Sequence, residues 1–169
     1  ETHTKGDTIL KSQINKFDSF TLDRSIEVSV RDGDKIVKLI AYADRLLEFK
    51  RKKMSIINIS EDIEFLEDTF FHKGVSHPAA VCETDFGVAW VNEFGCYLYD
   101  GKSVINLVER DGRRLISATD WTGFVESQPS TAEDNTIIGY SAPKRQLVVL
   151  RNNETGEGND GHVFVYDML

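Results

Sequence analysis

The loop at residues 152–161 holds residue types that could bind a ligand. Its segment "GEGNDG", residues 156–161, matches G-x-G-x-x-G, a pattern that places a dinucleotide pyrophosphate at the start of a following helix. Here the chain continues with "HVFVYD", whose alternation is typical of a strand. We therefore interpret the segment as a hairpin loop and expect no cofactor.

Oxygen donors in the same loop could bind Ca²⁺, which takes six to eight oxygen ligands. Their spacing differs from that of an EF-hand loop, and a solvated acidic loop explains them without an ion. No metal site is assigned, and the candidate ligands are Glu154, Glu157, Asn159 and Asp160.

Zinc-type donors occur at His72, His77, Cys82 and Cys96. Structural zinc sites are built from tightly spaced pairs such as C-x2-C, and these residues are not spaced in that way. Both cysteines lie in apolar, strand-like runs, on what we expect to be the first and third strands of one sheet, so buried free thiols are expected.

Nucleophilic and glycosidase chemistry have no recognisable pattern in this chain. There is no G-x-S-x-G elbow, and the neighbours Ser76 and His77 point to opposite faces of a strand. None of the 28 acidic residues is singled out as a catalytic pair. The basic run "KRKK", residues 50–53, falls at a predicted hairpin tip and is interpreted as a solvated turn. We expect no enzymatic activity.

The bulk properties are those of a globular chain with an acidic surface. It has 169 residues, 40% hydrophobic content and a formal net charge of −8. No apolar run approaches the roughly 20 residues of a membrane helix. Because nucleic-acid affinity comes largely from Lys and Arg on phosphates, tight sequence-independent binding to DNA is not expected.

Short alternating runs bounded by turn residues predict antiparallel strands along most of the chain. Residues 1–15 are polar and are expected to be loosely ordered. Residues 60–71 match both a helical stripe and a strand, and the strands around them favour an outer strand. The strands are predicted at residues 25–30, 36–42, 46–50, 54–59, 65–71, 79–82, 88–91, 96–99, 104–108, 136–140, 146–150 and 162–166.

The same order of strand, turn, apolar strand and hairpin recurs three times. A period of about 40–50 residues built from short strands is typical of propeller blades. The fold predicted is therefore all-β, with about three antiparallel propeller-like blades that form part of a larger propeller; a β-sandwich is the alternative. Residues 1–24 form a polar N-terminal segment, and residues 25–169 form the β domain, with repeats at about 32–74, 75–125 and 134–169.

The segment "DFGVAWVNEFGCYLYDGK", residues 85–102, is predicted to form the inner hairpin of one blade. Its glycines allow tight turns, its aromatic side chains fill the core, and an Asp-Gly pair reverses the chain. The residues assigned to this structural hairpin are Gly87, Trp90, Asn92, Gly95, Tyr97, Tyr99, Asp100 and Gly101.

Further motifs precede the hairpin: "DRL-x-x-F" at residues 44–49 and "KGV-x-x-P" at residues 73–78. Together with the hairpin's "G-x-x-W-x-N-x-x-G-x-Y-x-Y-D-G", these motifs over residues 32–108 resemble the propeller-like repeats of bacteriophage virion proteins, above all the tail nozzle, or tail tubular, proteins of short-tailed phages. Those proteins are much longer and include a platform for the portal or adaptor ring, which is not recognisable here.

The resemblance implies a non-enzymatic structural component of a phage particle, a wall scaffold of the tail or tail nozzle. It implies localisation in the virion after assembly in the bacterial cytoplasm. The partners would be other virion proteins or copies of the chain, without a membrane and without specific nucleic-acid binding, although DNA could pass through a tail channel. The alternative is a β-propeller module that binds proteins or carbohydrates.

Overall fold

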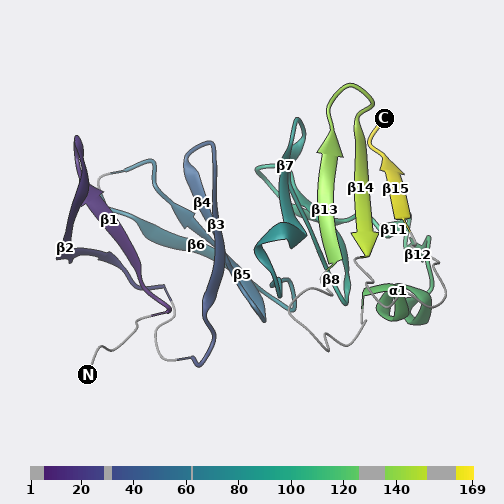
Figure 1. The fold of residues 1–169 in the computed structure, drawn as a ribbon, viewed down its shortest axis with the longest axis horizontal. Helices are drawn as coiled ribbons and strands as arrows, with labels where there is room; N and C mark the ends of the chain where they lie inside the picture. Colours follow the sequence, from purple (N-terminus) through teal and green to yellow (C-terminus); the bar gives the residue numbers. More distant parts are fainter. Residues whose placement is uncertain (1–5, 29–31, 62, 126–135, 152–162) are drawn as a thin grey trace. The chain divides into compact units, whose positions relative to one another are not determined.

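The computed structural model describes residues 6–28, 32–61, 63–125, 136–151 and 163–169. The chain divides into two compact units, Glu1–Gly74 and Val75–Leu169, and Figure 1 shows strands as the main element of both. All pairings between strands are antiparallel within the described ranges. The prediction of an all-β fold with antiparallel sheets is confirmed.

The first unit contains a hairpin and a four-stranded sheet. In the sheet each strand pairs with its neighbour in sequence, in the order β3-β4-β5-β6. The hairpin strands are β1 (Ile9–Gln13) and β2 (Lys16–Ile26), and the sheet strands are β3 (Ile36–Tyr42), β4 (Arg45–Lys50), β5 (Lys53–Asn58) and β6 (Phe65–Phe71).

The second unit contains a second four-stranded sheet, in the order β10-β9-β8-β7, a two-stranded hairpin and a three-stranded sheet, in the order β13-β14-β15. Its elements are η1 (Pro78–Ala80), β7 (Val81–Thr84), β8 (Gly87–Asn92), β9 (Gly95–Tyr99), β10 (Val104–Asn106), β11 (Glu109–Arg110), β12 (Arg113–Arg114), α1 (Ala118–Val125), β13 (Thr136–Ser141), β14 (Gln146–Arg151) and β15 (Val163–Asp167).

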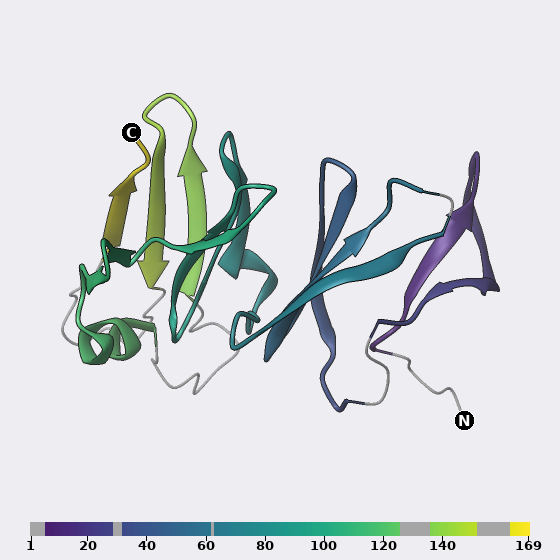
Figure 2. The ribbon, with the colours of Figure 1, turned by 180° about the vertical axis from the view of Figure 1, so that it is seen from behind.

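The middle strands of the four-stranded sheets are covered on both faces. Every residue of β8 and β9 is buried, as are the last four residues of β4 and the first five of β5. A strand buried on both faces reads as a continuous apolar run, which explains the sequence "GVAWV" in β8. In the second unit the first strand of the third sheet, β13, contacts β7, β8 and η1, and Figure 2 shows this third sheet beside β7.

The N-terminal part of the chain differs from the prediction. Residues 9–13 form β1, although residues 1–15 were expected to be loosely ordered. The strand expected at residues 25–30 is wrong as placed, because β2 begins at Lys16 and ends at Ile26. Apolar residues are interspersed among runs of polar ones along β2, and pairing with β1 satisfies its backbone without a fully apolar run.

Two short elements in the segment between the second and third sheets were missed. Asp111 and Gly112 have positive φ angles of 52° and 74°, the backbone of a two-residue hairpin turn, and they join β11 to β12. The Asp-Gly pair was therefore a readable signal. Helix α1 is only eight residues long, too short to give a clear helical periodicity.

Candidate functional site

Five residues of the predicted hairpin, Trp90, Asn92, Gly95, Tyr97 and Tyr99, share one face of β8 and β9. The register places Trp90 opposite Tyr97 and Asn92 opposite Gly95, and side chains two residues apart on a strand share a face. The rings of Trp90 and Tyr97 lie 5.5 Å apart between centroids, and both residues are buried. These aromatic side chains therefore belong to the core of the second sheet.

Two glycines of this hairpin occupy positions that no side chain could share. Gly87 has a φ of 141°, and a Cβ there would lie 2.0 Å from the carbonyl oxygen of Tyr99. A Cβ on Gly95 would lie 2.7 Å from Oδ1 of Asn106 and 3.2 Å from the ring of Tyr97. The glycines are thus fixed by close backbone approach and by the aromatic ring that lies across Gly95.

Asn92 and Asp100 hold the two turns of the hairpin. Oδ1 of Asn92 accepts hydrogen bonds from the backbone N–H groups of Phe94, at 2.9 Å, and Gly95, at 3.2 Å. Oδ1 of Asp100 accepts from the N–H groups of Lys102 and Ser103, both at 2.8 Å, while Gly101 takes a φ of 94°. Both side chains satisfy turn backbone that strands leave unpaired.

The hairpin also anchors helix α1. Nε1 of Trp121 donates a 2.9 Å hydrogen bond to the backbone carbonyl of Asn92, and the Trp121 side chain is buried. Its ring lies 5.7 Å from that of Phe164 in β15, and the rings of Phe124 and Phe164 meet edge to face at 4.5 Å. No sequence pattern had singled out Trp121 or Phe124.

A small apolar cavity lies beside this aromatic cluster. Its volume is about 70 Å³, and its lining includes Leu107, Leu115, Trp121, Val149 and Phe164. Binding sites for small molecules usually measure about 300–1,000 Å³ and place a few polar groups among apolar ones. The cavity is too small and too apolar to select a sugar.

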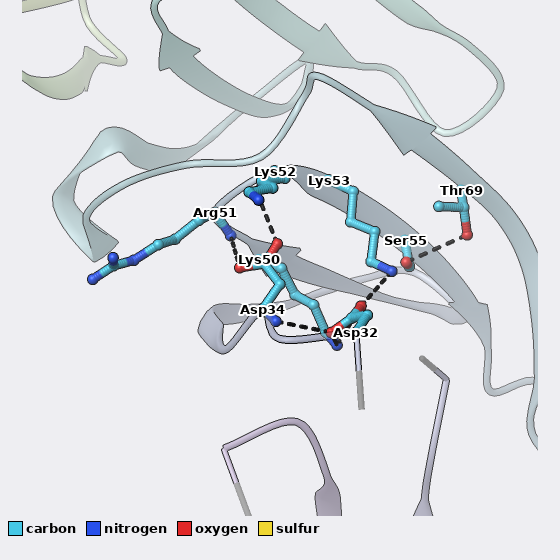
Figure 3. Close-up of polar contacts among 8 residues, drawn as sticks. All are labelled: Asp32, Asp34, Lys50, Arg51, Lys52, Lys53, Ser55 and Thr69. Carbon is cyan, nitrogen blue, oxygen red and sulfur yellow. Dashed lines mark hydrogen bonds and ion pairs between the residues drawn. The ribbon is translucent and has the colours of Figure 1, made fainter. Parts of the chain in front are cut away.

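The first unit contains a cluster of charged side chains on one face of the first sheet (Figure 3). Nζ of Lys53 lies 2.5 Å and Nζ of Lys50 3.3 Å from Oδ2 of Asp32. Lys50 is fully buried, and Lys53 is 9% exposed. Nearby, the hydroxyl oxygens of Ser55 and Thr69 lie 3.4 Å apart. We call Asp32, Glu48, Lys50 and Lys53 the ionic cluster.

The loop beside this cluster is held by a second carboxylate. The two oxygens of Asp34 accept hydrogen bonds from the backbone N–H groups of Arg51, at 3.0 Å, and Lys52, at 2.9 Å (Figure 3). The interpretation of "KRKK" as a solvated turn therefore holds for Arg51 and Lys52, which are exposed. It is wrong for Lys50 and Lys53, because segment 32–34 covers their amino groups.

The two carboxylates of the ionic cluster have opposite pKa shifts. Burial alone raises the pKa of Asp32, but hydrogen bonds from Lys53, the backbone N–H of Asp34 and Lys50 outweigh it and lower the pKa from 3.8 to about 2. Burial raises the pKa of Glu48 above 4.5, against the attraction of Lys50 and Lys53. Neither oxygen of Glu48 has a hydrogen-bond partner among the described residues.

Two members of the ionic cluster, Glu48 and Lys50, are closed to a substrate. Glu48 is 1% exposed and Lys50 is 0% exposed. A general acid or base must reach within hydrogen-bond distance of the reacting group, which these burials prevent in this conformation. The burial of these two side chains favours a role in the stability of the first unit.

The predicted donor residues do not assemble into a metal site in the part of the chain that is described. Glu154, Glu157, Asn159 and Asp160 lie outside the described residues. No group of three or more His, Cys, Asp or Glu residues suited to a metal occurs among those that are described. Nδ1 of His77 accepts a 3.2 Å hydrogen bond from the N–H of Ala79 and caps η1.

The cysteines lie where the strand pattern placed them. Cys82 is on β7 and Cys96 on β9, and neither forms a disulfide. Cys96 is buried as expected, but Cys82 is only half-buried, so that part of the prediction is wrong for Cys82. Burial, with a smaller contribution from Cys82, raises the pKa of Cys96 to about 12. Since the thiolate is the reactive form, Cys96 is protonated at neutral pH and chemically quiet.

Comparison with protein family models finds no match, and comparison with curated proteins finds none. Among the described residues, no helix has both the length and the apolar character needed to cross a membrane.

Proposed function

We propose that this chain is a non-enzymatic structural protein of a bacteriophage particle, in which propeller-like blades form part of the wall of the tail or tail nozzle. The observation that carries the proposal is the second four-stranded sheet. The motif residues that resemble the phage repeats, from Gly87 to Gly101, form its two buried middle strands and their turns. Each has a packing or turn role there, as expected of a scaffold unit.

The order of the sheets supports a blade-like architecture. Three meander sheets follow one another along the chain, and in each the strands are adjacent in sequence order. In the second unit, β13 lies against β7, so the first strands of consecutive sheets are neighbours. Propeller blades are also four-stranded sheets repeated around an axis, and their stacking would give a stiff wall.

The charge of the chain supports a conduit that does not retain DNA. With a formal net charge of −8, the protein surface repels phosphates over the range of the Debye length. Partners are then other virion proteins or further copies of the chain, with only passive contact with DNA. The location that follows is the virion, after assembly in the bacterial cytoplasm.

Immunogold labelling of purified particles, from a phage whose genome encodes the chain, tests this role. The expected result is label on the tail or at the junction of tail and head, and absence of label from intact and opened particles would refute it. The conduit mechanism is tested by filter binding of the purified chain to duplex DNA at physiological salt, where no retention is expected. Retention of DNA there would refute that mechanism.

A further inference from the structure

Among the described residues, only one face of the third sheet is covered. In its buried rows, Ile138 pairs in register with Val149, and Leu147 lies in the row beyond; these side chains are 8%, 3% and 0% exposed. On the other face Leu150, Val163 and Val165 are 38%, 49% and 57% exposed. This contrasts with β8 and β9 of the second sheet, where all residues are buried.

These exposed side chains form a continuous apolar surface together with the half-buried Ile137 and Val148. The register aligns Ile137 with Leu150 and Val163, and in the next row it aligns Gly139 with Val148 and Val165. We call this surface the open face; it consists of Ile137, Gly139, Val148, Leu150, Val163 and Val165. The run "QLVVL" of β14 is apolar at every position but the first, as in strands that are covered on both faces.

Gly139 lies on β13, at one edge of this surface, and the described residues impose no steric requirement for glycine there. A Cβ built there meets no atom within 4 Å, and its φ is not among the positive glycine φ angles. A glycine inside a strand weakens the sheet and marks places where another backbone approaches closely. The open face therefore has the features of a contact surface.

We propose that the open face binds the open face of a second copy of this chain. This inference rests on the proposed scaffold role, because it names the surface through which copies assemble. Among the described residues of the three meander sheets, no other face has exposed apolar side chains aligned in successive rows. In the first sheet, exposed Leu39 and Phe71 lie in rows with buried polar Glu48 and Lys53. A like surface matches the open face in chemistry, in an isologous contact.

Charges at one end of the sheet fix the geometry of this contact. Exposed Lys144 and Arg145 lie in the turn between β13 and β14, and exposed Asp167 ends β15 at the same end of the sheet. A two-fold axis parallel to the strands, between sheets about 10 Å apart, places β14 over β14 and β15 over β13 of the partner. Asp167 of each copy then lies over the turn of the other copy that carries Lys144 and Arg145. The two-fold axis therefore gives two equivalent pairings of opposite charges.

The test measures mass against concentration by light scattering and analytical ultracentrifugation, from micromolar to submillimolar protein. The expected result is a monomer–dimer equilibrium that Val165→Asp weakens at least tenfold. Ile105→Asp is the matched control, because Ile105 lies on β10 of the second sheet, away from the open face, and is 44% exposed. This substitution should leave the monomer–dimer equilibrium unchanged. Far-UV circular dichroism and thermal unfolding check that both variants fold.

A charge exchange tests the axis independently of the apolar substitutions. Asp167→Lys and the double variant Lys144→Asp, Arg145→Asp should each dimerise several-fold less tightly, and an equimolar mixture should regain dimers as heterodimers. A wild-type chain that stays monomeric, equal effects of Val165→Asp and Ile105→Asp, or a mixture that gains nothing would overturn the inference. Particle labelling distinguishes the two proposals: a labelled tail without this dimer keeps the scaffold role, and a dimer without label removes it.

Discussion

Replacement of Asp32 by asparagine removes the carboxylate that neutralises two buried lysines. The asparagine keeps the size of the side chain and one acceptor oxygen, but it leaves the amino groups of Lys50 and Lys53 without that counter-charge. Since Lys50 is fully buried, its charge cannot be solvated by water as an exposed lysine would be. We expect the first unit to lose stability while the second unit, residues 75–169, is unaffected.

The magnitude follows from the pKa of Asp32, which falls from 3.8 to about 2. At about 1.4 kcal/mol per unit, this shift corresponds to at most about 2.5 kcal/mol. The Asp32 side chain is 25% exposed. Solvent screening therefore reduces its contribution to the free energy of unfolding to about 1–2 kcal/mol. Because the folded pKa is depressed, this contribution is present above pH 3.8 and is lost as the pH falls toward 2.

Urea unfolding measures the effect, with tryptophan fluorescence and far-UV circular dichroism recorded together because the chain has two units. The fluorescence of Trp90 and Trp121 reports on the second unit. A transition that is seen by circular dichroism but not by fluorescence therefore belongs to the first unit. At pH 7 this transition should be destabilised by about 1–2 kcal/mol in Asp32→Asn, and the difference from the wild type should vanish near pH 2. Asp68→Asn, an exposed acidic residue on β6, is the control. A difference below about 0.3 kcal/mol at pH 7, or one that persists at pH 2, would refute the reasoning.

Other residues give further expectations for the same unfolding assays. Glu48→Gln should be more stable than the wild type at pH 8, by about 1.4 kcal/mol for each unit by which the pKa of Glu48 in the folded protein exceeds 4.5. Because that pKa is raised, the stability of the wild type declines as the pH rises through the pKa of the folded protein. A parallel decline in the variant would contradict this assignment to Glu48. Gly95→Ala should destabilise the second unit by about 1–3 kcal/mol through overpacking against Asn106, and an unchanged midpoint would show that the loop adapts. Trp121→Phe should cost about 1–3 kcal/mol, because the carbonyl of Asn92 loses its buried donor; a cost like that of an exposed substitution would exclude this role.

Local patterns were enough to place most of the strands. The predicted strand at residues 36–42 coincides with β3, and the outer strand at residues 65–71 coincides with β6. Alternation of apolar residues and turn pairs such as Asp100-Gly101 act over a few residues, so they can be read without knowledge of the fold. The same patterns identified Trp90 and Tyr97 as core residues.

The ionic cluster could not be read in this way. Along β4 and β5 the polar residues Glu48, Lys50, Lys53 and Ser55 alternate with apolar ones, a pattern that predicts a solvated face. The structure buries all four because a segment about 18 residues away in sequence, carrying Asp32 and Asp34, folds over that face. Which polar face is covered depends on long-range packing, which has no local signal.

Sequence alone thus determined the secondary structure class, the meander order and the turn residues, because each depends on backbone preferences within a few positions. Tertiary structure decided which faces are covered. It buried the charged face of the first sheet, and it placed Trp121 under the carbonyl of Asn92, 29 residues away. It also left the apolar face that carries Val148 and Val165 exposed, although the run in β14 reads as a strand covered on both sides. Burial is a property of contacts between distant segments, so only the assembled fold could assign it.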